Sequence, residues 1–108
     1  PDPKYHDYPD TVTCYAVSKK GKLGKKLFTI DEGSDGMAVD VKGNLYLTHG
    51  QVQVYDADGK KLETIEVPEK PANVCFGGKD YKTLFITART SLYQVRLLHA
   101  GAMSLRKR

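Results

Sequence analysis

The heptapeptide GKKLFTI at residues 24–30 recurs as GKKLETI at residues 59–65, a separation of 35 residues (59 minus 24). A second repeated pair alternates with the first along the chain, because NLYLT at 44–48 recurs as TLFIT at 83–87. A repeat of this length, built from short strand-forming runs, is typical of a β-propeller blade, in which four strands occupy about 40 residues. This repeat narrows the choice of fold more than any other feature of the chain.

The residues within each repeat favour β-strands. Tyr, Val, Ile, Thr and Leu cluster in short runs, which turns rich in Gly, Asp, Asn and Lys separate. The turns KGN (42–44), HGQ (49–51) and ADG (57–59) supply residues that tolerate a positive φ in tight hairpins. The sequence therefore predicts an all-β chain without helices, whose strands cover residues 13–17, 27–30, 37–41, 45–48, 52–55, 62–67, 73–76, 84–87 and 92–97.

In this register one blade is complete. Residues 34–67 hold its four strands, residues 13–30 supply the last two strands of the preceding blade, and residues 72–97 supply three strands of the following one. A basic tail occupies residues 98–108. Residues 1–108 are thus predicted to form a single partial propeller domain of about two and a quarter blades. Because propellers close into rings, we expect a piece of a longer polypeptide; pairing with another chain and unusual caps are the alternatives.

Composition restricts the partners of the chain. The net charge of +4 comes largely from lysines in turns, where they serve solubility and protect strand edges. Neither a basic face with aromatic side chains nor an apolar run near 18 residues is present, so we expect no nucleic acid and no membrane as partner. Cys14 and Cys75 lie in apolar strand-like runs and are predicted to be buried free thiols. The chain is expected to be soluble, with the compartment open between cytoplasm and periplasm or secretion.

Two polar residues occupy equivalent places in the repeat. SDGMAVD (34–40) corresponds to ANVCFGG (72–78), so Asp35 and Asn73 each stand at the mouth of the first strand of a blade. A carboxylate beside a glycine suits a hard, oxygen-seeking cation such as calcium or magnesium, whereas zinc usually recruits imidazole or thiolate as well. The alternative for Asp35 is a residue that caps its own turn. The alternative for Asn73 is an amide that satisfies backbone groups at the strand end.

Other apparent motifs do not have the required spacing. DADG (56–59) resembles the start of an EF-hand loop, but the twelfth position is Val67 rather than an acidic residue, so a hairpin turn is predicted there. FGGKD (76–80) lacks the Gly spacing and the Lys-Ser/Thr ending of a phosphate-binding loop. The serines have no nucleophile-elbow context, which excludes covalent serine catalysis from the hypotheses.

Three segments together resemble the gluconolactonase group of the SMP-30/gluconolactonase/luciferin-regenerating family. They are SDGMAVDVKGNLY (34–46), PANVCFGG (71–78) and KTLFITARTSLY (82–93), and their order and spacing match the C-terminal third of those enzymes over about residues 30 to 100. The resemblance implies a six-bladed propeller with a divalent metal in its central tunnel. It also implies hydrolysis of sugar lactones to aldonic acids.

The resemblance assigns roles to particular residues. The aspartate of the family's PDG or SDG motif falls on Asp35, which is therefore implied as a metal ligand and as a catalytic residue. Asn73, in the equivalent inner position, is expected to contact the substrate. Calcium is the favoured ion, with magnesium and zinc as alternatives. The family's glutamate ligand and its asparagine in an NG motif match no residue here, so the isolated chain is expected to lack a complete active site.

Two functions follow from these observations. The first is a C-terminal segment of a divalent-metal-dependent sugar lactonase, which acts on an aldonolactone and needs the remainder of the propeller. The alternative is a non-catalytic, truncated propeller that serves as a binding or self-assembly module, in which another copy of the chain is the partner. The absence of two family ligands from the sequence motivates the alternative.

Overall fold

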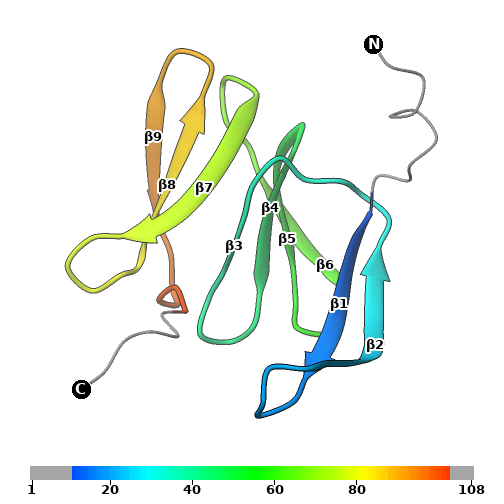
Figure 1. Cartoon of the computed structure of the whole chain (residues 1–108). Coiled ribbons are helices and arrows are strands. Elements are labelled where there is room, and N and C mark those ends of the chain that lie inside the picture. Colours follow the sequence, from blue (N-terminus) through cyan, green and yellow to red (C-terminus); the bar gives the residue numbers. More distant parts are fainter. Residues whose placement is uncertain (1–10, 103–108) are drawn as a thin grey trace. The chain divides into compact units, whose positions relative to one another are not determined.

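The structure is a computed structural model, and it describes residues 11–102 of the chain. These residues contain nine β-strands and no helix, so none of them forms a helix that could span a membrane (Figure 1). The all-β class and all nine predicted strands are confirmed. The strands are β1 (Val12–Val17), β2 (Leu23–Ile30), β3 (Met37–Val39), β4 (Leu45–His49), β5 (Gln51–Tyr55), β6 (Lys61–Ile65), β7 (Pro71–Gly77), β8 (Thr83–Ala88) and β9 (Leu92–Arg96).

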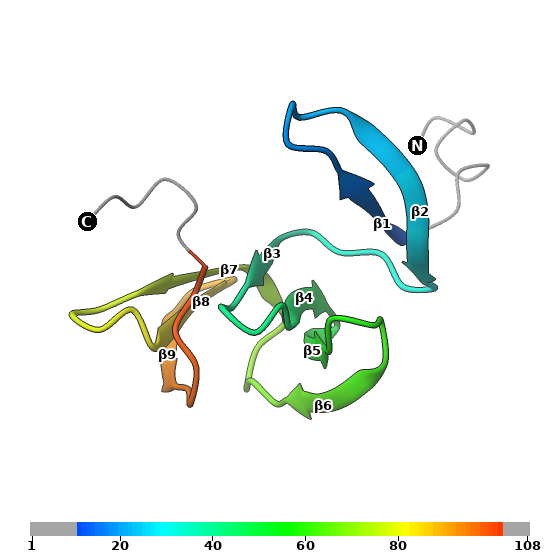
Figure 2. The same cartoon turned by 90° about the horizontal axis from the view of Figure 1, so that it is seen from below.

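The strands form three antiparallel meanders in chain order. The first sheet is the hairpin β1–β2, the second has the order β3–β4–β5–β6, and the third has the order β7–β8–β9. Figure 2 shows β3, β4, β5 and β6 following one another across their sheet. The chain divides into two compact units, Pro1–Ser34 and Asp35–Arg108, and the second unit holds the second and third sheets. The assignment of residues 1–108 to one propeller domain stays a prediction.

The hairpin β1–β2 is longer than the sequence predicts, because β2 begins at Leu23 rather than at residue 27. Val17 pairs with Leu23 directly after the turn, and the register shifts on either side of Tyr15. The turn explains the early start. The Ser18 hydroxyl accepts the N–H groups of Lys20 at 3.2 Å and of Lys22 at 3.1 Å, which brings the chain back into pairing at once.

The same turn closes three hairpins. The side-chain oxygen of its first residue, Ser18, Asp40 or Asp56, accepts the backbone N–H groups two and four residues later, at 2.9 to 3.2 Å. The fourth residue is a glycine with a positive φ, which side chains rarely adopt. These glycines are Gly21 (φ 83°), Gly43 (φ 87°) and Gly59 (φ 86°). The prediction that residues 56–59 form a hairpin turn is confirmed.

The core of the second unit lies between its two sheets. Alternate residues of each strand point toward the facing sheet, and the aromatic rings of Tyr46 and Phe76 meet edge to face with centroids 5.4 Å apart. Each fully buried apolar side chain stabilises such a core by about 1.5–3 kcal/mol. The buried cluster comprises Tyr46, Val52, Val54, Val67, Val74, Phe76, Leu84 and Ile86.

Residues that the sequence assigns to a basic tail are partly tied to the second sheet. We call Ala100–Ala102 the C-terminal strap. Val41 donates its N–H to Ala100 O, and Ala102 donates its N–H to Val39 O, both at 2.8 Å. Asp40 and Gly101 form an antiparallel bridge between these bonds. Residues 103–108, and the N-terminal residues 1–10, lie outside the described part of the chain.

The two cysteines are free thiols, as predicted. The expected burial is wrong for Cys75, which is exposed, while Cys14 is partly buried. Strand β7 alternates, so its neighbours Val74 and Phe76 point into the core and the Cys75 side chain points to the opposite face.

Candidate functional site

Asp35 lies two residues before the start of β3, at the end of the second sheet where β4 also ends. Its backbone N–H donates to Thr48 O at 3.1 Å, and its side chain is exposed. Asp40 and Asp56 cap backbone N–H groups with their carboxylates, but within residues 11–102 no such bond involves the carboxylate of Asp35. The turn-capping alternative for Asp35 therefore has no hydrogen bond to support it in the described part of the chain. Its carboxylate oxygens face solvent, where a cation has access.

Thr48, the fourth residue of β4, holds the segment that contains Asp35. Only 1% of Thr48 is exposed. Its backbone N–H donates to Gly36 O at 3.1 Å, and its hydroxyl oxygen accepts the Gly36 N–H at 2.8 Å. The same hydroxyl lies 3.2 Å from Gly36 O and 3.2 Å from Ala72 O, so its proton is donated to one or the other carbonyl. One buried side chain thus links the entry of β3 to the start of β7.

Asn73 lies in β7, opposite Thr87 of β8, and its side chain is exposed. Its Oδ1 accepts the N–H of Val74 at 2.8 Å. This bond is of the kind that the structural alternative for Asn73 describes. An amide oxygen has two lone pairs, so one remains for a further partner.

Gly36, the residue after Asp35, lies against Asn73. A Cβ atom added to Gly36 would lie 2.0 Å from Asn73 Oδ1 and 2.5 Å from Asn73 Cγ, so only glycine fits here without a shift of the asparagine. The residue that follows Asp35 in the chain therefore packs directly against the side chain of Asn73. The sequence repeat predicts both residues at blade mouths, and the contact with Asn73 is made by Gly36 rather than by the Asp35 side chain.

A shallow cavity borders Asn73 on the face of β7 and β8 that points away from the core. Its volume is about 100 Å³, and Asp35 does not line it. Pockets that enclose a drug-sized ligand measure roughly 300–1,000 Å³, so this cavity accommodates only part of such a molecule. Its walls are formed by Asn73, Val74, Cys75, Phe85 and Thr87.

The donor types at this end of the sheet fit a hard cation. The Asp35 carboxylate and the Asn73 amide oxygen are ligands that calcium and magnesium accept, and neither nitrogen nor sulfur is needed. Calcium takes six to eight oxygen ligands, more than these two side chains supply. Residues 11–102 contain no group of three or more His, Cys, Asp or Glu side chains that could hold a metal ion.

The sequence analysis did not predict a role for Thr48, although the repeat contains a signal for one. Thr48 ends the apolar run LYLT, and the second copy of that run ends with Thr87 at the equivalent position. In the structure the Thr87 hydroxyl lies 3.5 Å from Asn73 O, much as the Thr48 hydroxyl lies 3.2 Å from Gly36 O. A polar residue that both repeats hold at the mouth of the second strand marks a contact with the first strand.

Asp40 lies at the other end of β3 and is a structural carboxylate rather than part of this site. It is 1% exposed and accepts hydrogen bonds from Lys42 N (2.9 Å), Asn44 N (3.0 Å), Asn44 Nδ2 (2.9 Å) and the Tyr46 hydroxyl (2.9 Å). Burial raises the pKa of Asp40, but the bonds from Asn44, Tyr46 and Lys42 together outweigh it and hold that pKa below the ordinary value. Burial, followed by the bond to Asp40, raises the pKa of Tyr46.

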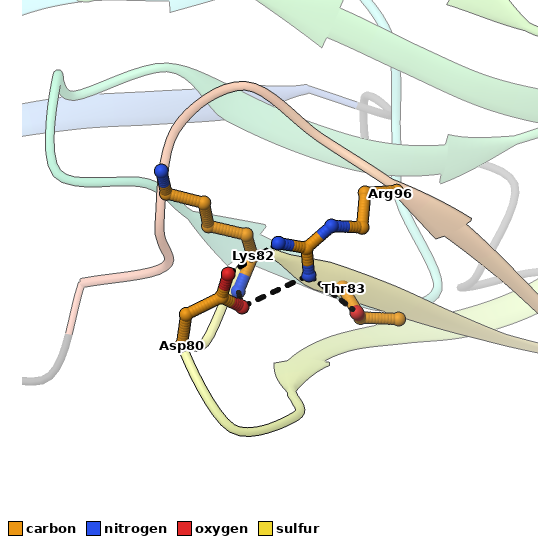
Figure 3. Close-up of polar contacts among 4 residues, drawn as sticks. All are labelled: Asp80, Lys82, Thr83 and Arg96. Atoms are coloured by element: carbon orange, nitrogen blue, oxygen red, sulfur yellow. Dashed lines mark hydrogen bonds and ion pairs between the residues drawn. The ribbon is translucent and has the colours of Figure 1, made fainter.

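A second polar cluster ties the turn between β7 and β8 to the end of β9. Figure 3 shows the guanidinium group of Arg96 against the carboxylate of Asp80, with Thr83 beside it. The Arg96 Nη1 to Asp80 Oδ1 distance is 2.9 Å, and Nη2 contacts Oδ2. The hydrogen bond from Arg96 lowers the pKa of Asp80 to about 2. Both side chains are exposed, 64% for Arg96 and 43% for Asp80, so the pair adds little to stability.

Comparison with known proteins identifies relatives of this chain. Residues 8–90 match the model of the SMP-30/gluconolactonase/LRE-like region. Regucalcin from Bos taurus is 39% identical over 79 residues, which cover 68% of this chain and 26% of that protein. Regucalcin from Danio rerio is 44% identical over 64 residues, which cover 54% of this chain and 22% of that protein. The chain thus spans about a quarter of the length of these curated relatives.

Solved structures that resemble this chain carry descriptions from the same family. A protein described as a candidate gluconolactonase superimposes with a TM-score of 0.73 at 26% identity, over 87% of this chain and 34% of that one. A luciferin-regenerating enzyme superimposes with a TM-score of 0.61 at 21% identity, over 74% of this chain and 31% of that one, which supports the fold alone. The prediction of an all-β chain that forms part of a propeller is confirmed. This chain therefore belongs to the SMP-30/gluconolactonase/LRE-like family.

Proposed function

We propose that this chain is a segment of a divalent-metal-dependent sugar lactonase that opens an aldonolactone to its aldonic acid. The observation that supports the proposal is the contact between Gly36, which directly follows Asp35, and the Asn73 side chain at one end of the second sheet. Membership of a family that includes gluconolactonases supports the substrate class. Calcium is the favoured ion because the Asp35 ligand is a carboxylate oxygen, and magnesium or zinc are the alternatives.

The residues have distinct tasks in this proposal. Asp35 binds the ion through its carboxylate and is placed to accept a proton from the attacking water. Asn73 orients the sugar lactone with its amide N–H groups. A bound divalent ion supplies Lewis-acid polarisation of the lactone carbonyl. In hydrolysis, the water oxygen bonds to the carbonyl carbon, the bond between that carbon and the ring oxygen breaks, and a proton passes to the freed oxygen.

The site is completed by parts of the propeller other than residues 11–102. Calcium needs more oxygen ligands than Asp35 and Asn73 provide, and ring closure brings blades that are distant in the sequence to one tunnel. The lactone is therefore expected to contact this segment on one side only. The remainder of the ring is the partner that the proposal requires.

The proposal is tested with Asp35→Asn in the intact protein. We expect the wild type to bind one calcium ion in calorimetric titration and to hydrolyse gluconolactone. The variant is expected to lose calcium affinity by at least about 10²-fold, together with hydrolysis, because a neutral amide replaces the charged ligand. Asp56→Asn is the matched control, since that carboxylate caps a hairpin turn. Undiminished hydrolysis by Asp35→Asn would contradict the proposal. A stable oligomer whose melting temperature does not change when divalent ions are added would favour a non-catalytic module.

A further inference from the structure

We infer that Thr48 is a positioning residue, whose hydroxyl sets the placement of Asp35 relative to Asn73 at the proposed metal site. This inference rests on the proposed function and adds a residue that neither carries charge nor faces solvent. Thr48 is 1% exposed and so cannot contact a sugar. Its role must therefore be exerted through the backbone it holds.

The contacts of Thr48 converge on the peptide that carries Asp35. The Asp35 N–H, the Gly36 N–H and the Gly36 carbonyl all bond to this one residue, at 2.8 to 3.1 Å for the closest contact of each. Two of these bonds join backbone to backbone, and the hydroxyl adds the third, at the Gly36 N–H, so the segment cannot rotate freely. The direction in which the Asp35 side chain leaves the backbone is thereby restricted.

The same hydroxyl also reaches the neighbouring sheet. Ala72 O lies 3.2 Å from Thr48 Oγ1, and Ala72 directly precedes Asn73. Gly36 in turn packs against the Asn73 side chain, where an added Cβ would lie 2.0 Å from Oδ1. Thr48 thus fixes both sides of the contact on which the proposed site depends. Groups that orient metal ligands in this way typically change metal affinity 10- to 100-fold when they are lost.

Thr48→Val tests the hydroxyl with little change of shape, because valine replaces the hydroxyl with a methyl group. The Gly36 N–H then loses its hydrogen bond to the Thr48 hydroxyl. We expect faster hydrogen–deuterium exchange at the Gly36 amide and a calcium affinity about 10- to 100-fold weaker than that of the wild type, both in the intact protein. Thr48→Ser keeps the hydroxyl and is expected to retain near-wild-type calcium binding and exchange.

Thr64→Val is the matched control, since the Thr64 hydroxyl also donates a side-chain hydrogen bond, to Gln53 at 2.7 Å, but lies in the outer strand β6. It is expected to bind calcium like the wild type. If Asp35→Asn abolishes calcium binding while Thr48→Val binds like the wild type, the positioning role is wrong and the proposed function stands. If neither the wild type nor Asp35→Asn binds a divalent ion, the proposed function fails, and the role of Thr48 at a metal fails with it. Unchanged hydrogen–deuterium exchange at the Gly36 amide in Thr48→Val would show that the Thr48 hydroxyl does not hold this segment.

Discussion

Three aspartates of this chain carry the same carboxylate in three different surroundings. Asp35 is exposed, and in the described part of the chain its carboxylate caps no backbone group. Asp56 is exposed and accepts two N–H groups of its own hairpin turn. Asp40 is buried and accepts four hydrogen bonds. Of the three, only Asp35 has no hydrogen bond to either carboxylate oxygen in the described part of the chain, so surroundings rather than residue type separate a candidate site from a structural element.

Asp40→Asn is expected to lower the free energy of unfolding at pH 7 by about 1.5–3 kcal/mol, the range for hydrogen bonds to a charged group. The new amide nitrogen would face other donors, namely Asn44 Nδ2 and the Tyr46 hydroxyl. Urea unfolding of both proteins measures the difference. Tyr46→Phe is the control, since it removes one of the four bonds and should cost less.

The pH dependence of this stabilisation has a definite sign. The folded-state pKa of Asp40 lies below its ordinary value of 3.8, so the ionised form is favoured by folding. Its contribution is fully present above the unfolded pKa and is lost as the pH falls through the folded pKa. The wild type should therefore lose stability more steeply than Asp40→Asn below about pH 4. Equal slopes for the two proteins would show that the Asp40 carboxylate is not held in its charged form.

Elements were predictable where a local pattern determines them. Alternating apolar residues and glycine turns located all nine strands, because strand period and positive-φ turns depend on neighbouring residues. The early start of β2 at Leu23 was missed, since polar residues there gain their strand pairing from the tight turn at Ser18. The roles of Thr48 and of the C-terminal strap were missed for another reason. Both depend on partners far away in the sequence, which no local pattern reveals.

Glu69, in the connection between β6 and β7, forms hydrogen bonds with the turn between β8 and β9 and with β9. Its Oε1 accepts the Thr90 N–H at 3.0 Å and the Thr90 hydroxyl at 2.9 Å, and its Oε2 accepts the Tyr93 hydroxyl at 2.8 Å. Hydrogen bonds from Ser91, Tyr93 and Thr90 lower the pKa of Glu69 to about 2. We expect an NMR titration of the Glu69 side-chain carboxyl group to give a midpoint near that value.

Glu69→Gln should weaken these hydrogen bonds without unfolding the sheet. The amide replaces one acceptor oxygen with a donor, so protection of the Thr90 amide against exchange should fall at neutral pH. In the wild type the contribution of Glu69 is present above the unfolded pKa near 4.5 and is lost as the pH falls toward about 2. Glu66→Gln, in the same connection, is the control. A Glu69 midpoint near 4.5 would contradict the contacts described here.

At the scale of the whole molecule, a propeller takes the residues of a central site from several blades. Blade mouths that are distant in the sequence meet at one tunnel in a propeller, and this chain spans about a quarter of its curated relatives. The repeat predicts Asp35 and Asn73 at equivalent mouths, and the structure adds the contact between Gly36 and the Asn73 side chain.

The two sheets of the second unit are joined at the end opposite the candidate site by the C-terminal strap. Its outer residues pair with Val39 and Val41 of the second sheet, while the Gly101 N–H donates to Tyr81 O in the third at 2.9 Å. Tyr81 has a φ of 63°, a conformation that costs a side-chain-bearing residue about 1–2 kcal/mol. The strap and the packing of the Tyr81 ring against Phe76, with centroids 6.2 Å apart, help to hold that conformation.

Gly101→Ala is expected to disrupt this junction. A Cβ atom at Gly101 would lie 2.3 Å from Phe76 Cγ and 2.4 Å from Phe76 Cβ, within a buried ring that has no room to retreat. Overpacking of this kind costs about 1–3 kcal/mol of the free energy of unfolding, measurable by urea denaturation, and amides of the strap should exchange faster. Gly24→Ala is the control, since its nearest contact would be an ordinary 3.7 Å to Ala16 O. If Gly101→Ala unfolds at the same urea concentration as the wild type, Phe76 moves aside without cost, and the close contact between Gly101 and Phe76 is not what stabilises this junction.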